Sequence, residues 1–250
     1  MTRIGFGIDV GGSGVKGARV DLDTGEFIGE RLKIATPKPA TPDAVSETIA
    51  QILDEMEWDG AVGITLPAVI REQTALTAAN IDEGWIGTNV SELFHRHLGD
   101  REICVLNDAD AAGMAEANYG EPEARTGNVI FLTLGTGIGS AFLNDGVLVP
   151  NTEIGHMKVK GTEAEVYASS AAKDRDELSY TEWAKRLSKV LKEYEKLFWP
   201  SLFIVGGGIS RKADKWIPKL KCQTKVIPAK LRNTAGIVGA AMAAEQGLRP

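Results

Sequence analysis

A glycine-rich hairpin occurs twice in this chain, and the repetition restricts the folds that are open to it. Residues 4–27 read IGFGIDVGGSGVKGARVDLDTGEF, and residues 129–147 repeat the plan as VIFLTLGTGIGSAFLNDGV. In each copy an apolar strand enters a glycine turn and a second strand leaves it. Glycine tolerates positive φ and lets backbone N–H groups approach an anion without a Cβ in the way. A single turn of this kind is also typical of an ordinary tight hairpin, but the pair predicts two turns that hold one phosphate chain.

The segments after the first hairpin follow the periods of an α/β fold. Thr41 and Pro42 offer an N-cap followed by proline at the first helical position. Apolar residues then recur at three- and four-residue spacing as far as Met56, which predicts a helix with one face on a sheet. The first half is predicted as β-β-β-α-β-α-β, with strands at about 4–9, 15–21, 27–35, 61–66 and 103–106 and a second helix at 90–98 that Gly99 ends.

The second half is predicted to repeat this order. After its hairpin, Ser179 and Glu182 form a capping box for a helix that Pro200 ends. A strand at 202–205 follows, and the small residues of 237–247 predict a helix that packs closely against another element. We therefore expect an α/β protein with an actin-like (ribonuclease H-like) fold, in which a cleft between two lobes binds small ligands. The expected lobes are residues 1–108, with 237–250 packed back on them, and the larger 109–236.

Composition favours an enzyme of the cytoplasm. The chain has 250 residues, 43% of them apolar, which suits one large domain or two lobes of ordinary size. Its apolar runs are too short to span a membrane, and it enters a strand at once without a signal-peptide pattern. Cys104 and Cys222 form neither a disulfide framework nor a zinc-ligand spacing. Reduced thiols and no membrane partner are expected.

The charge distribution is uneven. The net charge of −6 argues against nucleic-acid binding, because that mode depends on many Lys and Arg contacts with phosphates. Between residues 211 and 232, however, Asp214 is the one acidic residue, and the basic ones are Arg211, Lys212, Lys215, Lys219, Lys221, Lys225, Lys230 and Arg232. Such a run is typical of a solvated surface. It also fits a track for a polyanion.

The chain contains candidates for each part of a phosphoryl-transfer site. That chemistry needs phosphates held in line, their charge neutralised and a carboxylate near the attacking hydroxyl. Asp9 ends the first strand and is a candidate to hold Mg²⁺ through water, although a turn aspartate would fit the same position. The candidate donor-binding residues are Gly11, Gly12, Ser13, Gly14 and Lys16 in the first hairpin and Gly135, Thr136, Gly137 and Gly139 in the second.

The Asn107-Asp108 pair lies between the two hairpins, directly after an apolar strand and before a small-residue helix. Asp108 could be the N-cap of that helix. It could equally be a general base that accepts a proton from a sugar hydroxyl. Asn107 supplies both a donor and an acceptor, which polyol recognition requires.

Glu153-Ile154-Gly155-His156 is a third group of polar residues. A glutamate and a histidine three residues apart can present two polar tips to one ligand. A histidine with a purely structural role is the alternative, and the pair is not interpreted as a metal site. His95 and His97 are predicted to be surface residues.

The motifs DVGGSGVKGA, TAANI, LNDADAA, LTLGTGIGSA, EIGHMKV and IVGGGIS, in this order, resemble those of the ROK family of bacterial sugar kinases and repressors. The resemblance covers essentially the whole chain. Within the family, TLPAVI, TAANIDEGWIGTN and LFIVGGGISRKADKW are most similar to the polyphosphate-using glucokinases. The resemblance implies an actin-like two-lobed fold, phosphorylation of the glucose 6-hydroxyl, dependence on Mg²⁺ and a homodimer.

The resemblance also implies roles for single residues. Asp108 would be the catalytic base and would touch the sugar, Asn107 would be a glucose ligand, and Asn80 would line the sugar pocket. Glu153 and His156 would be the family's sugar-binding pair, and Glu165 would be a further sugar-binding glutamate. Gly206, Gly207 and Gly208 match the glycine motif on the nucleotide side.

Two family features are missing from the sequence. Many members have a cysteine cluster that binds zinc shortly after the Gly-His motif, whereas here MKVKGTEAEVYASSAAK follows His156. A structural zinc is therefore not expected. Family repressors carry a DNA-binding extension before the first phosphate motif, and the first strand here is expected to begin at about residue 4, which argues against a repressor.

The leading hypothesis is a glucokinase that transfers a phosphoryl group from inorganic polyphosphate, and also from ATP, to the 6-hydroxyl of glucose. The alternative within the fold is a strictly ATP-dependent kinase for glucose, mannose or an N-acetylated sugar, because the sequence does not give the shape of the sugar pocket. A sugar-sensing protein without catalysis is the alternative of a different class.

Overall fold

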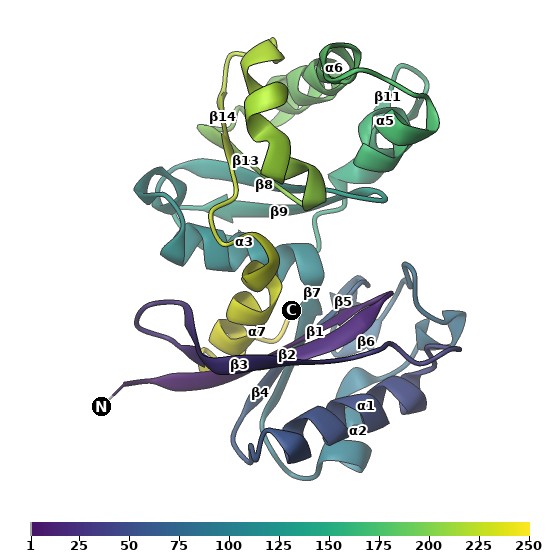
Figure 1. Ribbon diagram of the computed structural model, residues 1–250, viewed down its shortest axis with the longest axis vertical. Coiled ribbons are helices and arrows are strands. Elements are labelled where there is room, and N and C mark those ends of the chain that lie inside the picture. Colours follow the sequence, from purple (N-terminus) through teal and green to yellow (C-terminus); the bar gives the residue numbers. More distant parts are fainter. Residues whose placement is uncertain (1) are drawn as a thin grey trace. The chain divides into compact units, whose positions relative to one another are not determined.

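The computed structural model describes residues 2–250 and divides the chain into two compact units (Figure 1). Unit 1 consists of Met1–Ala115 together with Thr234–Pro250, and unit 2 of Glu116–Asn233. The chain therefore passes from unit 1 to unit 2 inside one helix and returns just before another. Among the described residues, none of the helices is both long and apolar enough to cross a membrane.

Unit 1 is built on a five-stranded sheet with the order β3-β2-β1-β4-β7. The strands β1, β2 and β3 form an antiparallel meander, and β4 and β7 then run parallel to β1. The bounds are β1 Ile4–Gly11, β2 Gly14–Asp21, β3 Glu26–Ile34, β4 Val62–Leu66 and β7 Ile103–Asn107. All five predicted strands of the first half are present.

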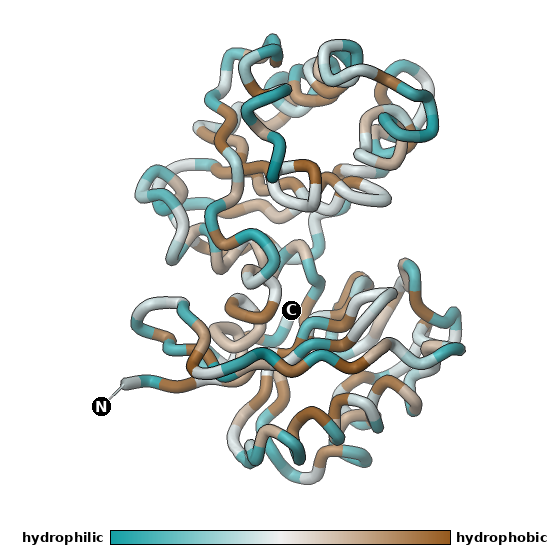
Figure 2. Tube along the Cα trace, viewed as in Figure 1, coloured by the Kyte–Doolittle hydropathy of each residue, from teal (hydrophilic) through white to brown (hydrophobic). Residues whose placement is uncertain are grey.

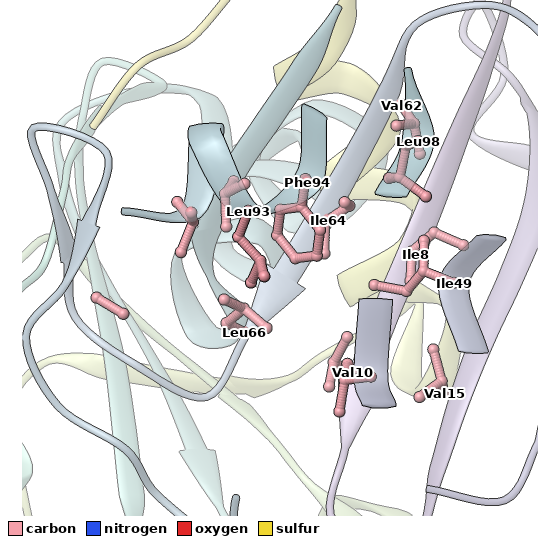
Figure 3. Packing of buried hydrophobic residues seen from close by; sticks show 14 of the residues in the cluster. Ile8, Val10, Val15, Ile49, Val62, Ile64, Leu66, Leu93, Phe94 and Leu98 are labelled. Carbon is pink, nitrogen blue, oxygen red and sulfur yellow. The ribbon is translucent and has the colours of Figure 1, made fainter. Parts of the chain in front are cut away.

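Two helices of unit 1 begin and end at local signals. Helix α1 (Pro42–Glu55) begins at Thr41, whose hydroxyl accepts from the N–H of Ala44. Helix α2 (Val90–Leu98) is capped by Asn89 and ends at Gly99. Their apolar faces and the sheet form one buried core. In Figure 3, Ile8 and Ile49 lie next to each other in this core, and Leu66 and Phe94 lie in another part of it.

Helix α7 (Ala235–Glu245) packs on this sheet so closely that its main chain approaches the main chain of the strands. A Cβ added to Gly7 would overlap the carbonyl oxygen of Ile237, and one added to Gly63 would overlap that of Ala240. The same holds between Gly239 of α7 and Ala111 of helix α3 (Asp108–Tyr119). The close packing predicted for the small-residue helix is therefore confirmed, and the strands supply the matching glycines.

Unit 2 repeats the sheet of unit 1. Its order is β10-β9-β8-β13-β14, again with three antiparallel strands followed by two parallel ones. The bounds are β8 Asn128–Leu134, β9 Ile138–Asn144, β10 Val147–Val149, β13 Leu202–Gly206 and β14 Lys225–Pro228. The duplication predicted from the two glycine hairpins is thus present in the order and direction of five strands.

Helix α6 (Tyr180–Phe198) is the main helix of unit 2 and carries the predicted capping box of Ser179 and Glu182. Its apolar face packs into a core that includes Trp183 and Trp216, whose ring centroids are 5.0 Å apart. Figure 2 shows mixed hydrophobic and hydrophilic colour along β3, which is mostly exposed. Residues 211–215 read RKADK and are mostly hydrophilic. The remaining elements are short: β5 Ile70–Arg71, β6 Thr74–Ala75, β11 Lys158–Val159, β12 Thr162–Glu163, α4 Ala164–Ala168, α5 Ser170–Arg175 and the 3₁₀ helices η1 Glu83–Trp85, η2 Pro122–Arg125, η3 Ile154–His156, η4 Gly208–Lys215, η5 Ile217–Lys219 and η6 Arg232–Thr234.

Candidate functional site

The first glycine turn connects β1 and β2. Gly11 pairs with Gly14, so that Gly12 and Ser13 form an exposed two-residue turn. None of the three glycines has a positive φ, in contrast to the reason given for them from the sequence. Close approach explains two of them: a Cβ on Gly14 would overlap the side chain of Lys33, and a Cβ on Gly12 would lie 3.3 Å from the carbonyl oxygen of Asn80. Asn80 is exposed and itself has φ 61°, a conformation that asparagine tolerates.

Asp9 lies within β1 and both of its carboxylate oxygens have partners. Lys16 Nζ is 2.7 Å from Oδ2, and the hydroxyl of Thr65 donates to Oδ1 at 3.2 Å. The sheet register explains this arrangement, because Asp9 is paired with Lys16 on β2 and with Thr65 on β4. The side chains of Asp9 and Lys16 are 22% and 23% exposed, so solvent still reaches the pair. Sequence reasoning missed Thr65, since only the strand pairing brings it to Asp9.

Asn107 ends β7 and caps α3. Its Oδ1 accepts from the N–H groups of Ala109 at 2.8 Å and Asp110 at 3.2 Å, and its Nδ2 donates to the carbonyl of Ala68 at 3.2 Å. The side chain is buried, and one N–H of Nδ2 is not used by these bonds. The capping position that the sequence allowed for Asp108 is therefore filled by Asn107.

Asp108 is the first residue of α3 and is exposed. Its Oδ1 accepts from the N–H of Ala109 at 2.9 Å. A carboxylate in the first turn of a helix is stabilised by the partial positive charge of that end. Strands β1, β4 and β7 are parallel neighbours, and Asp9 and Asn107 both lie near their C-terminal ends, two strand spacings or about 10 Å apart. Ligands of open α/β sheets bind at this edge.

The second glycine turn connects β8 and β9 in unit 2. Leu134 pairs with Ile138, and Gly135 donates to the carbonyl of Gly137 at 3.1 Å across the turn. Thr136 at its tip is exposed, and Gly139 lies in β9 opposite Thr133. As in the first turn, positive φ is not used at these glycines.

Glu165 packs directly against this second turn. Its Oε2 accepts from the N–H of Ile138 at 3.3 Å, and a Cβ on Gly137 would overlap the same carboxylate. A side chain at position 137 would therefore displace the Glu165 carboxylate from the turn. Glu165 was a candidate from the family resemblance alone, and the second glycine hairpin was a candidate from the internal repeat. The structure places the two in contact.

The segment Glu153–His156 is held against β9. A Cβ on Gly155 would overlap the carbonyl oxygen of Ile138, the N–H of Ile154 donates to Ser140 Oγ at 3.2 Å, and the hydroxyl of Tyr194 donates to the carbonyl of Ile154 at 2.9 Å. The glycine between the two polar residues permits this close approach. Burial raises the pKa of Glu153, and the nearby carboxylate of Glu165 adds to the increase while His156 opposes it.

His156 lies among carboxylates. Its Nδ1 is 3.3 Å from Glu163 Oε2 and 3.8 Å from Glu165 Oε1. Burial alone would lower the pKa of His156, but the hydrogen bond to Glu163 and the charges of Glu165, Glu163 and Glu153 raise it. One ligand atom from each of His156, Glu163 and Glu165 lies within 4.8 Å of the others. Such a group can bond several hydroxyls of a polyol. Glu163 was not selected from the sequence, where nothing distinguishes it from other surface glutamates.

Gly206 is the last residue of β13, the parallel neighbour of β8, and Gly207 and Gly208 follow it. Gly207 has φ 83°, and a Cβ there would lie 2.5 Å from the carbonyl oxygen of Leu134. Only glycine fits this position. Gly208 is exposed, and a Cβ on it would meet no atom within 4 Å.

The candidate residues therefore form one group in each unit. Unit 1 holds the first turn, Asp9, Lys16, Asn80, Asn107 and Asp108 at one edge of its sheet. Unit 2 holds the second turn, Glu153, His156, Glu165 and the glycines after β13. Carboxylates, amides and exposed backbone turns of this kind bind hydroxyls and phosphates.

Comparison with known proteins places this arrangement in a family. The ROK family profile matches residues 5–169, and the chain belongs to the ROK family. The predicted α/β class with an actin-like fold is confirmed by the solved structures of that family.

Three relatives illustrate the match. The chain is 55% identical over 241 residues to a polyphosphate glucokinase of Mycobacterium tuberculosis, which covers 96% of this chain and 91% of that protein. It is similar to the crystal structure of an inorganic polyphosphate/ATP-glucomannokinase from Arthrobacter sp. strain KM, with a TM-score of 0.90, 46% identity and 99% of both chains covered. A ROK family glucokinase from Streptomyces griseus, solved with glucose and AMPPNP, matches with a TM-score of 0.82 and 25% identity over 98% of this chain and 100% of that one.

Proposed function

We propose that this protein is a glucokinase that transfers a phosphoryl group from inorganic polyphosphate, and also from ATP, to the 6-hydroxyl of glucose. The observation that carries the proposal is the exposed Asp108 carboxylate beside the buried Asn107, in a chain 55% identical to a polyphosphate glucokinase over nearly its full length. The relative solved with glucose and AMPPNP supports a sugar acceptor and a nucleotide donor.

Asp108 is proposed as the general base. The sugar hydroxyl gives its proton to the carboxylate as its oxygen attacks the terminal phosphorus, and the bond from that phosphorus to the bridging oxygen of the donor breaks. Because Asn107 also accepts from the N–H groups of Ala109 and Asp110, the cap of α3 does not depend on Asp108 alone. Its exposure leaves it accessible to a substrate.

The sugar is proposed to bind Asn80, Asn107, Glu153, His156 and Glu165. Asn107 offers its remaining Nδ2 hydrogen, whereas Glu153 and Glu165 offer oxygens that accept from hydroxyl groups. Glu163 joins this set because of its hydrogen bond with His156.

The donor phosphates are proposed to bind the two glycine turns, Lys16 and the glycines after β13. The proposal thus assigns groups of both units to one reaction. The carboxylate of Asp9 is partly exposed and offers oxygen, the ligand type that Mg²⁺ prefers, so these residues fit a magnesium ion held through water. When bound, Mg²⁺ neutralises charge on the donor phosphates. Lys16 would share the Asp9 carboxylate with it.

The choice of donor is tested by initial rates on glucose with long-chain polyphosphate and with ATP. We expect turnover with both, because the relatives from M. tuberculosis and Arthrobacter are named for polyphosphate, the latter also for ATP. Activity with ATP alone would reject the polyphosphate donor and leave an ATP-dependent hexose kinase. Mannose belongs in the same panel, since the Arthrobacter protein is named a glucomannokinase.

A homodimer and a cytoplasmic location are proposed from the family resemblance, and light scattering of the purified protein tests the dimer.

A further inference from the structure

Unit 2 contains a cavity of about 510 Å³ at the C-terminal end of α6. It lies between the last turns of that helix and the segment that leads into β14. The lining residues are Lys192, Glu195, Lys196, Trp199, Pro200, Lys221, Cys222, Gln223 and Thr224. None of them belongs to the proposed sugar or phosphate groups. The cavity is thus a second candidate site.

We call residues 211–224 the basic segment. It connects the glycines at 206–208 to this cavity. It runs along α6 from one end to the other: Trp216 packs on Trp183, the N–H of Lys221 donates to Ser188 Oγ at 2.9 Å, and the N–H groups of residues 223 and 224 donate to Glu195 at 2.7 and 2.6 Å. Between Trp183 and Glu195 the helix rises about 18 Å. Figure 1 shows this segment beside α6. The segment therefore follows α6 over about 18 Å.

Positive charge continues along this path into the cavity. Arg211, Lys212, Lys215, Lys219 and Lys221 are all exposed. Lys192 and Lys196, one helical turn apart, add two more ammonium groups from α6. Within residues 2–250 neither Lys192 nor Lys221 has an ion-pair partner, whereas Lys196 pairs with Glu193 at 2.8 Å. Farther along the chain, Lys225 pairs with Glu123 and leaves the path.

The negative charge inside the cavity is already engaged. Glu195 accepts both of the backbone N–H groups described above with one oxygen, which fixes it as a structural group. Three lysines therefore face one carboxylate that is held by protein donors. The lining as a whole is cationic.

A purely structural explanation covers only part of this arrangement. Lysines in the last turns of a helix are favoured by its partial negative charge, which accounts for Lys192 and Lys196. It does not account for Lys221, which comes from another segment, nor for Trp199, whose side chain is 81% exposed.

The geometry points to a second phosphate-binding site in this cavity, which holds the distal part of a long polyphosphate chain whose reacting end lies at the glycines after β13. This inference rests on the proposed polyphosphate donor. A linear anion can follow the basic segment and be held at both ends, and the second attachment raises its affinity without new contacts at the reacting phosphate. The three phosphates of ATP are too short to reach from one end of α6 to the other.

The test uses the full chain and the double variant Lys192→Gln/Lys221→Gln. The Michaelis constants of long-chain polyphosphate, tripolyphosphate and ATP are measured with glucose saturating. We expect the constant for long chains to rise by about tenfold, with kcat unchanged, and the constants for the two short donors to stay within about twofold. The long-chain constant of the variant should also depend less on salt. The matched control, Arg31→Gln/Arg249→Gln, removes two exposed charges of unit 1, away from the cavity and from α6, and should leave all three constants unchanged.

Several outcomes would overturn the inference. Equal increases in the Michaelis constants of all three donors, or the same increase in the control variant, would mean that the substitutions changed only the overall electrostatic field of the protein. Unchanged constants at every chain length would mean that the cavity does not hold the donor. An increase for ATP alone would identify a nucleotide site instead. If the wild-type protein does not use polyphosphate, the donor assignment itself fails, and that result is visible before any variant is made.

Discussion

Asn107 and Asp108 are neighbours in the chain but have separate structural tasks. Asn107 is buried, holds the start of α3 with two hydrogen bonds and donates a third to the carbonyl of Ala68, whereas Asp108 is exposed at the first helical position. This division allows a proposed catalytic residue to be changed without removing the cap of its helix.

Asp108→Asn is expected to lower kcat by roughly two to four orders of magnitude, the range typical for the loss of a positioned base. The loss of a charge in the first helical turn should cost only about 0.3–1 kcal/mol of stability. Steady-state kinetics and thermal unfolding measure the two effects. Asp43→Asn is the control, because Asp43 is also an exposed aspartate in the first turn of a helix. It should lose at least as much stability, because Asp43 also contacts His97 Nε2 at 2.9 Å, and it should keep full turnover. A variant at 108 with wild-type kcat would remove that residue from the mechanism.

Glu116 is a second residue with a task of its own. Its side chain is 1% exposed, and its two oxygens accept from the N–H groups of Lys230 at 3.0 Å and Leu231 at 2.7 Å. It therefore joins the first residues of unit 2 to the last ones. Burial raises the pKa of Glu116, and the two backbone hydrogen bonds only partly offset this.

The raised pKa predicts a pH dependence of stability. The folded protein binds this proton more tightly than the unfolded chain, so the stabilising contribution is complete below the unfolded pKa of about 4.3 and is lost as the pH rises through the folded pKa. Glu116→Gln removes the titration. The free energy of unfolding of the wild type minus that of the variant should therefore decrease with rising pH, as measured by denaturant titrations. A difference that is constant or increases with pH would contradict the assignment.

Single residues also show where prediction from the sequence ends. The glycines of both turns were found by their pattern, but none of them uses positive φ, and Gly12, Gly14 and Gly137 instead lie close to Asn80, Lys33 and Glu165. Thr65 and Glu163 could not be found, since each meets its partner only after strands pair or a loop folds back. Contacts between distant segments leave little trace in local sequence. The roles assigned to the site residues stay predictions.

At the scale of elements, local signals gave most boundaries. Helix α2 spans the predicted residues 90–98 and ends at Gly99 as predicted, and α6 has its capping box, because caps are made by neighbouring residues. Helix α7 begins at residue 235, two positions earlier than predicted. The short elements between residues 154 and 175 and the 3₁₀ helices after β13 were not predicted in detail. These short elements are held in place by contacts with β9 and α6, which are distant in the sequence.

The packing of α7 gives an element-scale prediction. Gly63→Ala should destabilise the protein by more than about 3 kcal/mol, because its Cβ would overlap a main-chain carbonyl that cannot rotate away. Gly208→Ala is the matched control, since a Cβ there meets nothing within 4 Å, and its free energy of unfolding should change by less than about 0.5 kcal/mol. Denaturant unfolding compares the two. Equal stability of both variants would mean that α7 can move away from the sheet at little cost.

At the scale of the whole molecule, the duplication was the most predictable property. Two five-stranded sheets share one order of antiparallel and parallel strands, as the repeated hairpins indicated. The overall charge of −6 was less informative than its distribution, because basic residues concentrate in one mostly exposed segment of unit 2, residues 211–232. The cavity at the end of α6 was not predictable, since Lys192 and Lys221 are far apart in the chain.

The position of α7 has a consequence for how the protein is made. The sheet of unit 1 is complete by residue 107, yet the face that carries Gly7 and Gly63 stays uncovered until residues 235–245 have left the ribosome. Nascent chains usually fold in order from the N-terminus. Here unit 2 is continuous in sequence and can fold first, while the earliest strands wait for the last helix. A ribosome that stalls in the second half would therefore release a chain with an open hydrophobic surface, a ready target for chaperones and proteases.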